Sequence, residues 1–285
     1  MSRPNTIILD CIDSTNNYLK KLAKEGAADG TAVIARRQTA GKGRCGNSFQ
    51  SDLGGLYMSM LVRTEGLLLS DVTSITTKTA VAVAKGIELS AGVPCGIKWV
   101  NDIVLNRKKI CGILVEAGPL KQNLRTAENI STSSEDPYSS KDFSARVNTV
   151  QNEYQPEVSI PYVVIGVGIN VNTCEFADDI SSVATSLKLE TGRELNIEDV
   201  ANAVISSLDK LREHLTDRDS YYLEQYRYLC ATTGKNVTFV RDGIQHTCYA
   251  DSISDDYGLK VFNSDGSTEI LRSGEVHVRG LEGYV

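Results

Sequence analysis

Glycines and cationic side chains gather in one short loop of the sequence, and together they predict an anion site. The loop contains Arg37, Gly41, Lys42, Gly43, Arg44 and Gly46. Glycine lets backbone N–H groups approach a ligand closely, and Arg and Lys add charge for phosphate oxygens. A flexible surface turn would have a similar composition. The loop also matches neither the P-loop nor the dinucleotide-binding glycine pattern, so it predicts an anion site without naming the anion.

A second set of polar residues lies in two otherwise apolar runs that predict a β-hairpin. The set consists of Lys98, Asn101, Asp102 and Lys109. Charges in a largely buried sheet are costly unless they are paired or used in chemistry. The alternative is an exposed sheet edge whose charges prevent aggregation.

A third motif is the small and polar run from Gly166 to Asn170, at the end of an apolar strand predicted over residues 162–172. Its glycines either admit a ligand close to the backbone or allow a helix to pack closely, with Asn170 as a cap. The three histidines lie late in the chain beside no obvious nucleophile, so covalent catalysis by the protein is not expected.

The elements that must position these residues follow from hydrophobic periodicity. Strands are predicted over residues 6–10, 31–35, 56–62, 97–105 and 109–116, and helices from Ser14-Thr15 onward, over residues 72–91 and within residues 197–229. The mixture of strands and amphipathic helices predicts an α/β fold.

Two segments set the predicted domain organisation. Residues 118–158 are rich in Ser, Asn, Glu, Lys and Gln and show no sustained period, which predicts a mobile polar insertion in a first domain over residues 1–232. Five short strands separated by Gly, Asp and Asn turns follow, and they predict a small β-barrel domain over residues 233–285.

The amino-acid composition limits which classes of molecule the protein is expected to bind. Lys and Arg total 30, Asp and Glu total 36, and the formal net charge is −6, so no basic field is available to hold nucleic acid. Seven scattered cysteines without a C-x-x-C pair indicate a reducing compartment and no zinc site. Because no apolar run approaches the ~18 residues that span a bilayer, we expect a cytoplasmic protein without a membrane partner.

Taken together, the motifs resemble those of biotin protein ligases. They occur in the family's order as Ser14-Thr15-Asn16, Arg37 to Gly46, Lys98-Trp99-Val100-Asn101-Asp102 with Lys109 to Glu116, and Gly166 to Asn170. The run Ser273-Gly274-Glu275-Val276, followed by Val278 and Arg279, is similar to the end of the family's small C-terminal domain. Each motif is weak alone, but their order and spacing give a specific resemblance over residues 7–279, excluding the insertion.

The resemblance implies a fold, a reaction and partners. The fold would be a mixed β-sheet with helices on one face, followed by a small SH3-like barrel. The enzyme would use ATP and Mg²⁺ to convert biotin to biotinyl-5′-AMP, and would then transfer biotin to a lysine of the carrier domain of a biotin-dependent carboxylase. Some relatives carry an N-terminal helix-turn-helix and repress transcription. Because the Ser14 motif comes so early, we expect the form without that module and without DNA as a partner. Homodimer formation is left open.

The resemblance also implies roles for individual residues. Lys109 and Arg44 would be catalytic, meeting the biotin carboxylate and the α-phosphate. Biotin would be bound by Ser14, Thr15, Asn16, Gln38, Gly41, Arg44, Lys109, Gly112 and Gly168. ATP would be bound by Gly41, Lys42, Gly43, Arg44, Phe49, Asn101, Asp102 and Asn170, and the metal by Asp102 and Asn170.

Three positions depart from the family pattern. Lys42 replaces an arginine, Phe49 a tryptophan and Val100 a proline, but charge or apolar character is retained at each. Two other functions compete with biotin ligation. A lipoate or octanoate ligase or transferase shares the broad fold, and a non-catalytic carrier-binding protein would have a decayed site.

Overall fold

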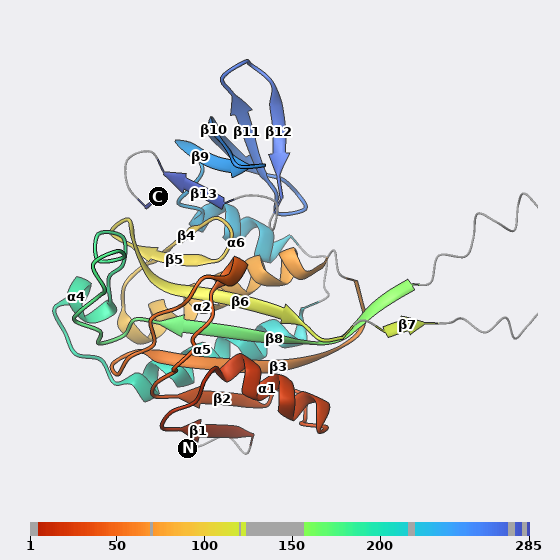
Figure 1. Cartoon of the computed structure of the whole chain (residues 1–285), viewed down its shortest axis with the longest axis vertical. Coiled ribbons are helices and arrows are strands. Elements are labelled where there is room, and N and C mark those ends of the chain that lie inside the picture. Colours follow the sequence, from red (N-terminus) through yellow and green to blue (C-terminus); the bar gives the residue numbers. More distant parts are fainter. Residues whose placement is uncertain are drawn as a thin grey trace, which may run out of the picture.

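The strands form a large mixed sheet and a smaller antiparallel sheet (Figure 1). The computed structural model describes residues 5–68, 71–119, 121–123, 157–215, 220–272, 277–280 and 284–285. Within these residues the large sheet has eight strands in the order β1-β2-β3-β8-β6-β5-β4, with β7 paired to β8. The strands are β1 (Thr6–Leu9), β2 (Ala32–Ala35), β3 (Leu56–Leu67), β4 (Gly96–Lys98), β5 (Asp102–Leu105), β6 (Lys108–Ala117), β7 (Lys121–Asn123) and β8 (Glu157–Ile169). Only β1 and β2 pair in parallel among them.

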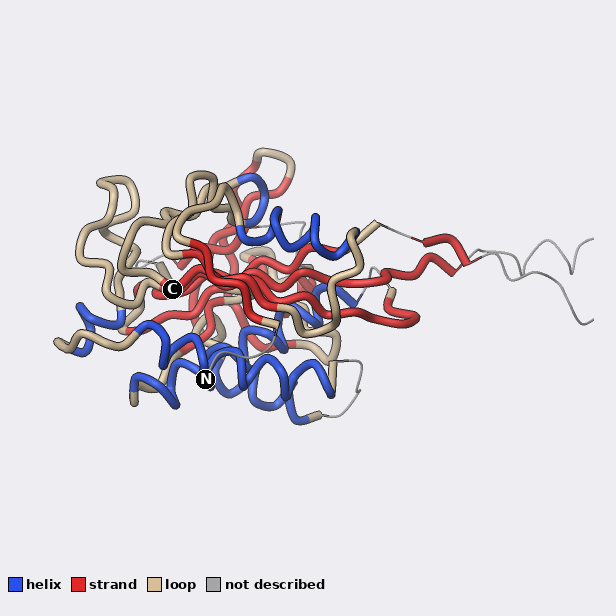
Figure 2. Tube along the Cα trace, turned by 90° about the horizontal axis from the view of Figure 1, so that it is seen from below, coloured by secondary structure: helices blue, strands red, loops and turns tan. Residues whose placement is uncertain are grey.

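The helices of the described residues cover both faces of this sheet. They are α1 (Thr15–Lys24), α2 (Val72–Ala91), α4 (Leu187–Thr191), α5 (Ile197–Glu213) and α6 (Tyr221–Leu229), with a 3-10 turn over Arg44–Gly46. Figure 2 shows the sheet nearly edge-on between helical layers. The mixed sheet with helices is confirmed, but the expectation that helices cover one face is too narrow, because α1 packs on the face opposite α2 and α5.

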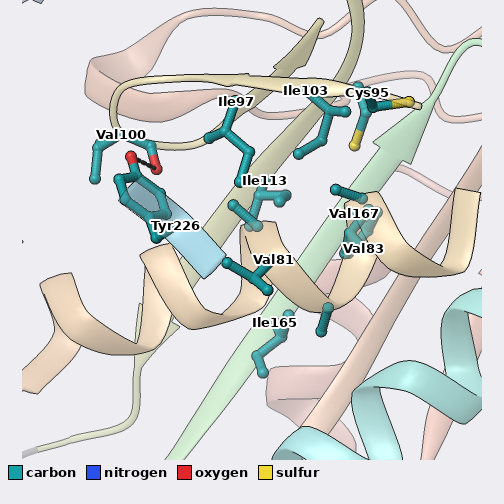
Figure 3. Packing of buried hydrophobic residues seen from close by; sticks show 14 of the residues in the cluster. Val81, Val83, Cys95, Ile97, Val100, Ile103, Ile113, Ile165, Val167 and Tyr226 are labelled. Atoms are coloured by element: carbon teal, nitrogen blue, oxygen red, sulfur yellow. Dashed lines mark hydrogen bonds between the residues drawn. The ribbon is translucent and has the colours of Figure 1, made fainter. Parts of the chain in front are cut away.

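The two faces follow from the alternation of side chains along the central strands. On β3, Met58 and Met60 belong to the core that includes α2 and α5, whereas Leu61 points the other way and packs with Leu19 of α1. Figure 3 shows part of the larger core, where side chains of β6 and β8 lie against those of α2. Helices therefore pack on both faces of the sheet that carries the site.

Helices α2 and α5 approach each other closely at a glycine. A Cβ atom on Gly86 would lie 2.8 Å from the Cα atom of Val204, which no side chain tolerates without backbone movement. The close approach lets α2 and α5 pack tightly together in the core beneath the sheet.

Strands are present at both ends of the segment predicted as a polar insertion. Lys121–Asn123 pairs with β8 at residues 157–159, so both ends of the predicted 118–158 segment extend the sheet. The predicted mobility of residues 124–156 lies outside the described residues. So does the first part of the predicted C-terminal motif, Ser273 to Val276, whereas its Val278 and Arg279 lie in a described strand.

The second sheet contains the five strands predicted for the barrel. Its order is β12-β11-β10-β9-β13, formed by β9 (Lys235–Arg241), β10 (Ile244–Ile253), β11 (Leu259–Asn263), β12 (Thr268–Leu271) and β13 (His277–Gly280). All the pairings are antiparallel.

One continuous hydrophobic core joins the second sheet to the first. The buried Trp99 donates its indole N–H to the carbonyl oxygen of Tyr257 at 3.0 Å. The hydroxyl of Tyr226 donates to the carbonyl oxygen of Val100 at 3.2 Å (Figure 3). The boundary between residues 232 and 233 stays a prediction. In the described part of the chain, no helix combines the length and the apolar character that crossing a membrane requires.

Candidate functional site

A cleft opens where the start of α1, the glycine loop, β6 and β8 meet. It contains about 480 Å³ of empty space, including its open mouth. Its walls are Ser14, Thr15, Asn16, Gln38, Lys42, Gly43, Arg44, Phe49, Met58, Asn101, Lys109, Gly112, Ile113, Leu114, Gly166, Val167 and Gly168. Most residues proposed from the sequence therefore come together in one place.

One end of the cleft is a buried cluster of neutral polar side chains, which is formed by Thr15, Asn16, Gln38 and Ser59 and which we call the polar cluster. The Thr15 backbone N–H and hydroxyl both donate to Gln38 Oε1, at 2.8 and 3.1 Å. The Ser59 hydroxyl lies 2.8 Å from Thr15 Oγ1 and 2.5 Å from Asn16 Oδ1. Since α1 begins at Thr15, its first residues reach the cleft with their side chains held in place.

A carboxylate outside the cleft orients Asn16. The Asn16 amide donates to Glu116 at 2.7 Å, and Lys20 donates to the other oxygen of Glu116 at 2.8 Å. Burial alone would raise the pKa of Glu116, but the hydrogen bonds from Lys20 and Asn16 outweigh burial and lower it. Glu116 therefore remains an acceptor that fixes the amide. The sequence predicted no role for Ser59 or Lys20. Glu116 ended the motif that begins at Lys109, but no role was predicted for it.

The floor of the cleft is a pair of glycines on neighbouring strands. Gly112 of β6 lies directly opposite Gly168 of β8. The ring of Phe49 lies over both, because a Cβ on Gly168 would come within 2.7 Å of it and a Cβ on Gly112 within 3.1 Å. The Phe49 ring and the two glycines thus form an apolar part of the cleft wall.

The other end of the cleft carries cations. Arg44 donates to Asn101 Oδ1 at 3.0 Å, and the Asn101 amide donates to the carbonyl oxygen of Ile113 at 2.7 Å. Lys42 extends away from this end, to Asn17 of α1 at 2.9 Å, in an exposed position. Asn101 therefore ties the glycine loop to the hairpin, as a positioning group beside Arg44.

Lys109 is the second cation, and a buried carboxylate holds it. Its ammonium nitrogen lies 2.7 Å from Asp102 Oδ1, and its backbone is fixed by the Lys109 N–H donating to Val183 and its carbonyl accepting from Thr185. Burial alone would raise the pKa of Asp102, but the charge and hydrogen bond of Lys109 outweigh burial and lower it. The pair lies in a hairpin, as predicted, and its two residues are half-buried and paired with each other rather than placed at an exposed sheet edge.

Lys98 lies behind this pair and is 6% exposed. Burial lowers its pKa to about 8, although Asp102 opposes the shift. In the unfolded chain the ammonium keeps its ordinary value near 10.4. Between these two pH values the unfolded chain binds more protons, so the contribution of Lys98 to the free energy of unfolding rises with pH.

We therefore expect wild type to gain about 2 kcal/mol of stability relative to Lys98→Met when the pH is raised from about 8 to about 10. Urea unfolding of both proteins at the two pH values measures the difference. An unchanged difference would contradict a buried, depressed ammonium at this position.

Three predicted site residues do not line the cleft. Gly41 packs against the Phe49 carbonyl and the Ser51 hydroxyl. Asp102 lies behind Lys109, and Asn170 is 6% exposed with its amide donated to the Thr185 carbonyl at 3.0 Å. Their roles in ATP and biotin binding stay predictions.

In this arrangement, the side chains of Asp102 and Asn170 do not form a site for a permanently bound magnesium ion. Asp102 places one oxygen on Lys109 and accepts the Tyr284 hydroxyl with the other. No group of three or more His, Cys, Asp or Glu residues in the described chain could hold a metal. The metal role of Asp102 and Asn170 therefore stays a prediction, and no step of the proposed reaction depends on it.

Comparison with known proteins identifies the family. Residues 8–127 match the model of the biotin/lipoate A/B protein ligase family. A bifunctional ligase/repressor BirA of Bacillus spizizenii is 32% identical over 214 residues, covering 74% of this chain and 54% of the relative. A biotin--[acetyl-CoA-carboxylase] ligase of Mycobacterium tuberculosis is 25% identical over 273 residues, covering 93% and 86%. Residues 8–127 therefore carry a biotin/lipoate A/B protein ligase domain.

Solved structures agree on the fold. The biotin protein ligase from Aquifex aeolicus in complex with biotin and ATP has a TM-score of 0.75 at 23% identity, covering 98% of this chain and 100% of that one. The ligase from Leishmania major in complex with biotinyl-5-AMP has a TM-score of 0.58 at 22% identity, covering 95% and 100%. Both of these structural neighbours are biotin protein ligases. The chain spans about half the length of the Bacillus relative.

Proposed function

We propose that this protein activates biotin with ATP and transfers it to a lysine of the carrier domain of a biotin-dependent carboxylase. The observation that carries the proposal is one cleft with a neutral polar cluster at one end, a glycine floor, and Lys109 and Arg44 at the other. Biotin has the matching order of groups, with a neutral ureido ring at one end and a carboxylate at the other.

In the first step, a biotin carboxylate oxygen attacks the α-phosphorus of ATP, the bond from phosphorus to the bridging oxygen breaks, and pyrophosphate leaves. Two anionic groups must approach each other, so cations beside both supply the main stabilisation. Lys109 and Arg44 would lie beside the carboxylate and the α-phosphate. Thr15, Asn16 and Gln38 would hold the ureido ring and fix the direction of the carboxylate.

In the second step, the acceptor lysine amine attacks the acyl carbon of biotinyl-5′-AMP. The carbon–oxygen bond to AMP breaks, AMP leaves, and the amine loses a proton as the amide forms. The mixed anhydride is reactive toward water, so the glycine loop and Phe49 would shield it until the carrier arrives.

Lipoate is the nearest competing substrate. Its dithiolane ring offers no hydrogen bonds to the polar cluster, whereas the ureido ring of biotin offers both donors and acceptors. The cluster therefore favours biotin. A cytoplasmic location is part of this proposal. The absence of a DNA partner stays a prediction, and homodimer formation stays open.

The test is intact-mass analysis of a biotin carboxyl carrier domain incubated with this protein, ATP and Mg²⁺, with either biotin or lipoate. We expect one biotin-sized mass gain and none with lipoate. A gain only with lipoate would replace the proposed substrate. No gain with either, together with no ATP–pyrophosphate exchange in folded protein, would favour the non-catalytic carrier-binding function.

A further inference from the structure

A tyrosine near the end of the sequence reaches back to the hairpin that carries Lys109. The Tyr284 hydroxyl donates to Asp102 Oδ2, and the Tyr284 ring covers the Lys98 ammonium, whose nitrogen lies 3.6 Å from the ring centroid. Burial is the main cause that raises the pKa of Tyr284, so the hydroxyl keeps its proton and stays a donor.

The neighbouring residue anchors this contact. Val285 is 3% exposed and packs against Gly280 of β13, where an added Cβ would lie 2.5 Å from the Val285 carbonyl carbon. Arg107, in the turn between β5 and β6, donates to the Val285 carbonyl oxygen at 3.3 Å. Tyr284 therefore contacts the base of the hairpin formed by β5 and β6, and Val285 contacts the turn of the same hairpin.

The contact forms one end of a chain of three side chains that reaches the cleft. Tyr284 holds one oxygen of Asp102, and the other oxygen lies 2.7 Å from the Lys109 ammonium nitrogen. Of the three residues, Lys109 lines the cleft, whereas Asp102 and Tyr284 lie behind it. A carboxylate that is hydrogen-bonded at one oxygen cannot rotate freely, so the direction in which it holds Lys109 is fixed.

We propose that Tyr284 is a positioning residue for adenylate formation, which acts through Asp102 to aim the Lys109 ammonium into the cleft. The inference rests on the proposed biotin-activating function. Supporting groups of this kind keep a charged side chain within the narrow geometry that charge stabilisation requires. Lys98 is a further cation near Asp102, but its ammonium lies over the Tyr284 ring, so tyrosine supplies the contact to Oδ2.

The proposal predicts a selective kinetic effect of Tyr284→Phe, which keeps the ring over Lys98 and removes the hydroxyl. We expect kcat for biotinyl-adenylate formation to fall about 10-fold, as for loss of one hydrogen bond to a charged group. The KM for biotin should change less than about 2-fold, because the polar cluster is untouched. Tyr249→Phe is the matched control, since Tyr249 is 41% exposed on β10, and it should leave kcat unchanged.

A double-mutant cycle with Asp102→Asn separates positioning from general support of the fold. If Tyr284 acts through Asp102, adding Tyr284→Phe to Asp102→Asn should lower the single-turnover rate less than about 2-fold. The urea midpoints of wild type, the two single variants and the double variant provide a readout that does not depend on catalysis. The changes in midpoint caused by the two substitutions should be non-additive as well.

Several outcomes would overturn the inference. These are wild-type kcat in Tyr284→Phe, an equal loss in Tyr249→Phe, and the same fold loss in both Asp102 backgrounds. If wild type forms no biotinyl-adenylate, the proposed function fails, and additive urea midpoints would then independently refute the coupling of Tyr284 to Asp102.

Discussion

Replacing Lys109 by alanine is expected to lower the rate of biotinyl-adenylate formation by about 10²–10³-fold. The ammonium is held by a buried carboxylate, so its direction is fixed before substrates arrive. Removing one preorganised group of this kind from an active site usually has an effect of this size. Single-turnover measurement of the adenylate with saturating biotin and ATP gives the rate directly.

The alanine variant also leaves Asp102 without its ion-pair partner, which should destabilise the fold by about 3–5 kcal/mol. Lys109→Arg separates the two effects, because it keeps the charge beside Asp102 but replaces a compact ammonium with a planar fork. It should fold normally and still react slowly. Lys108→Ala is the matched control, since Lys108 is the exposed neighbour on the same strand and points away from the cleft. Equal rates in Lys109→Arg, Lys109→Ala and wild type would exclude Lys109 from the reaction.

The second large effect is expected for Gly166→Ala, which should weaken biotin binding about 100-fold. A Cβ at this position would lie 2.3 Å from Asn16 Oδ1 and 2.9 Å from Asn16 Nδ2. The Asn16 side chain cannot simply rotate away, because Ser59 and Glu116 each hold one of its polar atoms. Moving it breaks two hydrogen bonds of about 1–1.5 kcal/mol each, and one factor of ten in affinity corresponds to about 1.4 kcal/mol.

Isothermal titration of biotin into the apo protein measures this effect. Asn16→Ala provides the matched background, because it removes the side chain with which the new methyl group would collide. In that background Gly166→Ala should change biotin affinity little. Unchanged affinity of Gly166→Ala alone would show that Asn16 does not bind the ureido ring in the proposed way.

Local patterns in the sequence predicted the elements and many of the cleft residues. The helix over residues 72–91 appears with those bounds, because its apolar spacing continues up to Gly92, which ends the helix in the left-handed conformation. The strand from Leu56 continues to Leu67, five residues beyond the predicted end, since its alternation stops at Arg63 while its backbone pairing resumes at Leu67 with Ile160 of β8. The charged hairpin was recognisable because charged residues interrupt its apolar runs.

The remaining features depend on contacts between distant parts of the chain. Asn16 and Glu116 are 100 residues apart, and Tyr284 and Asp102 are 182 residues apart. Tyr284 stands alone in a Gly-Tyr-Val sequence, so no periodic pattern indicates which residue it contacts. The face of the sheet on which α1 packs could not be predicted from the sequence either. An amphipathic helix fits either face of a sheet that is apolar on both sides.

The indole of Trp99 connects the two sheets, and it is the only tryptophan in the sequence. Its emission therefore reports on a single place, the joint between Val100 and the turn at Tyr257. A shift of the emission maximum to longer wavelength would signal water entering that joint, whether or not the large sheet remains folded. The chain thus carries its own optical probe of separation between the two sheets, which needs no label and can be followed during titration with biotin or ATP.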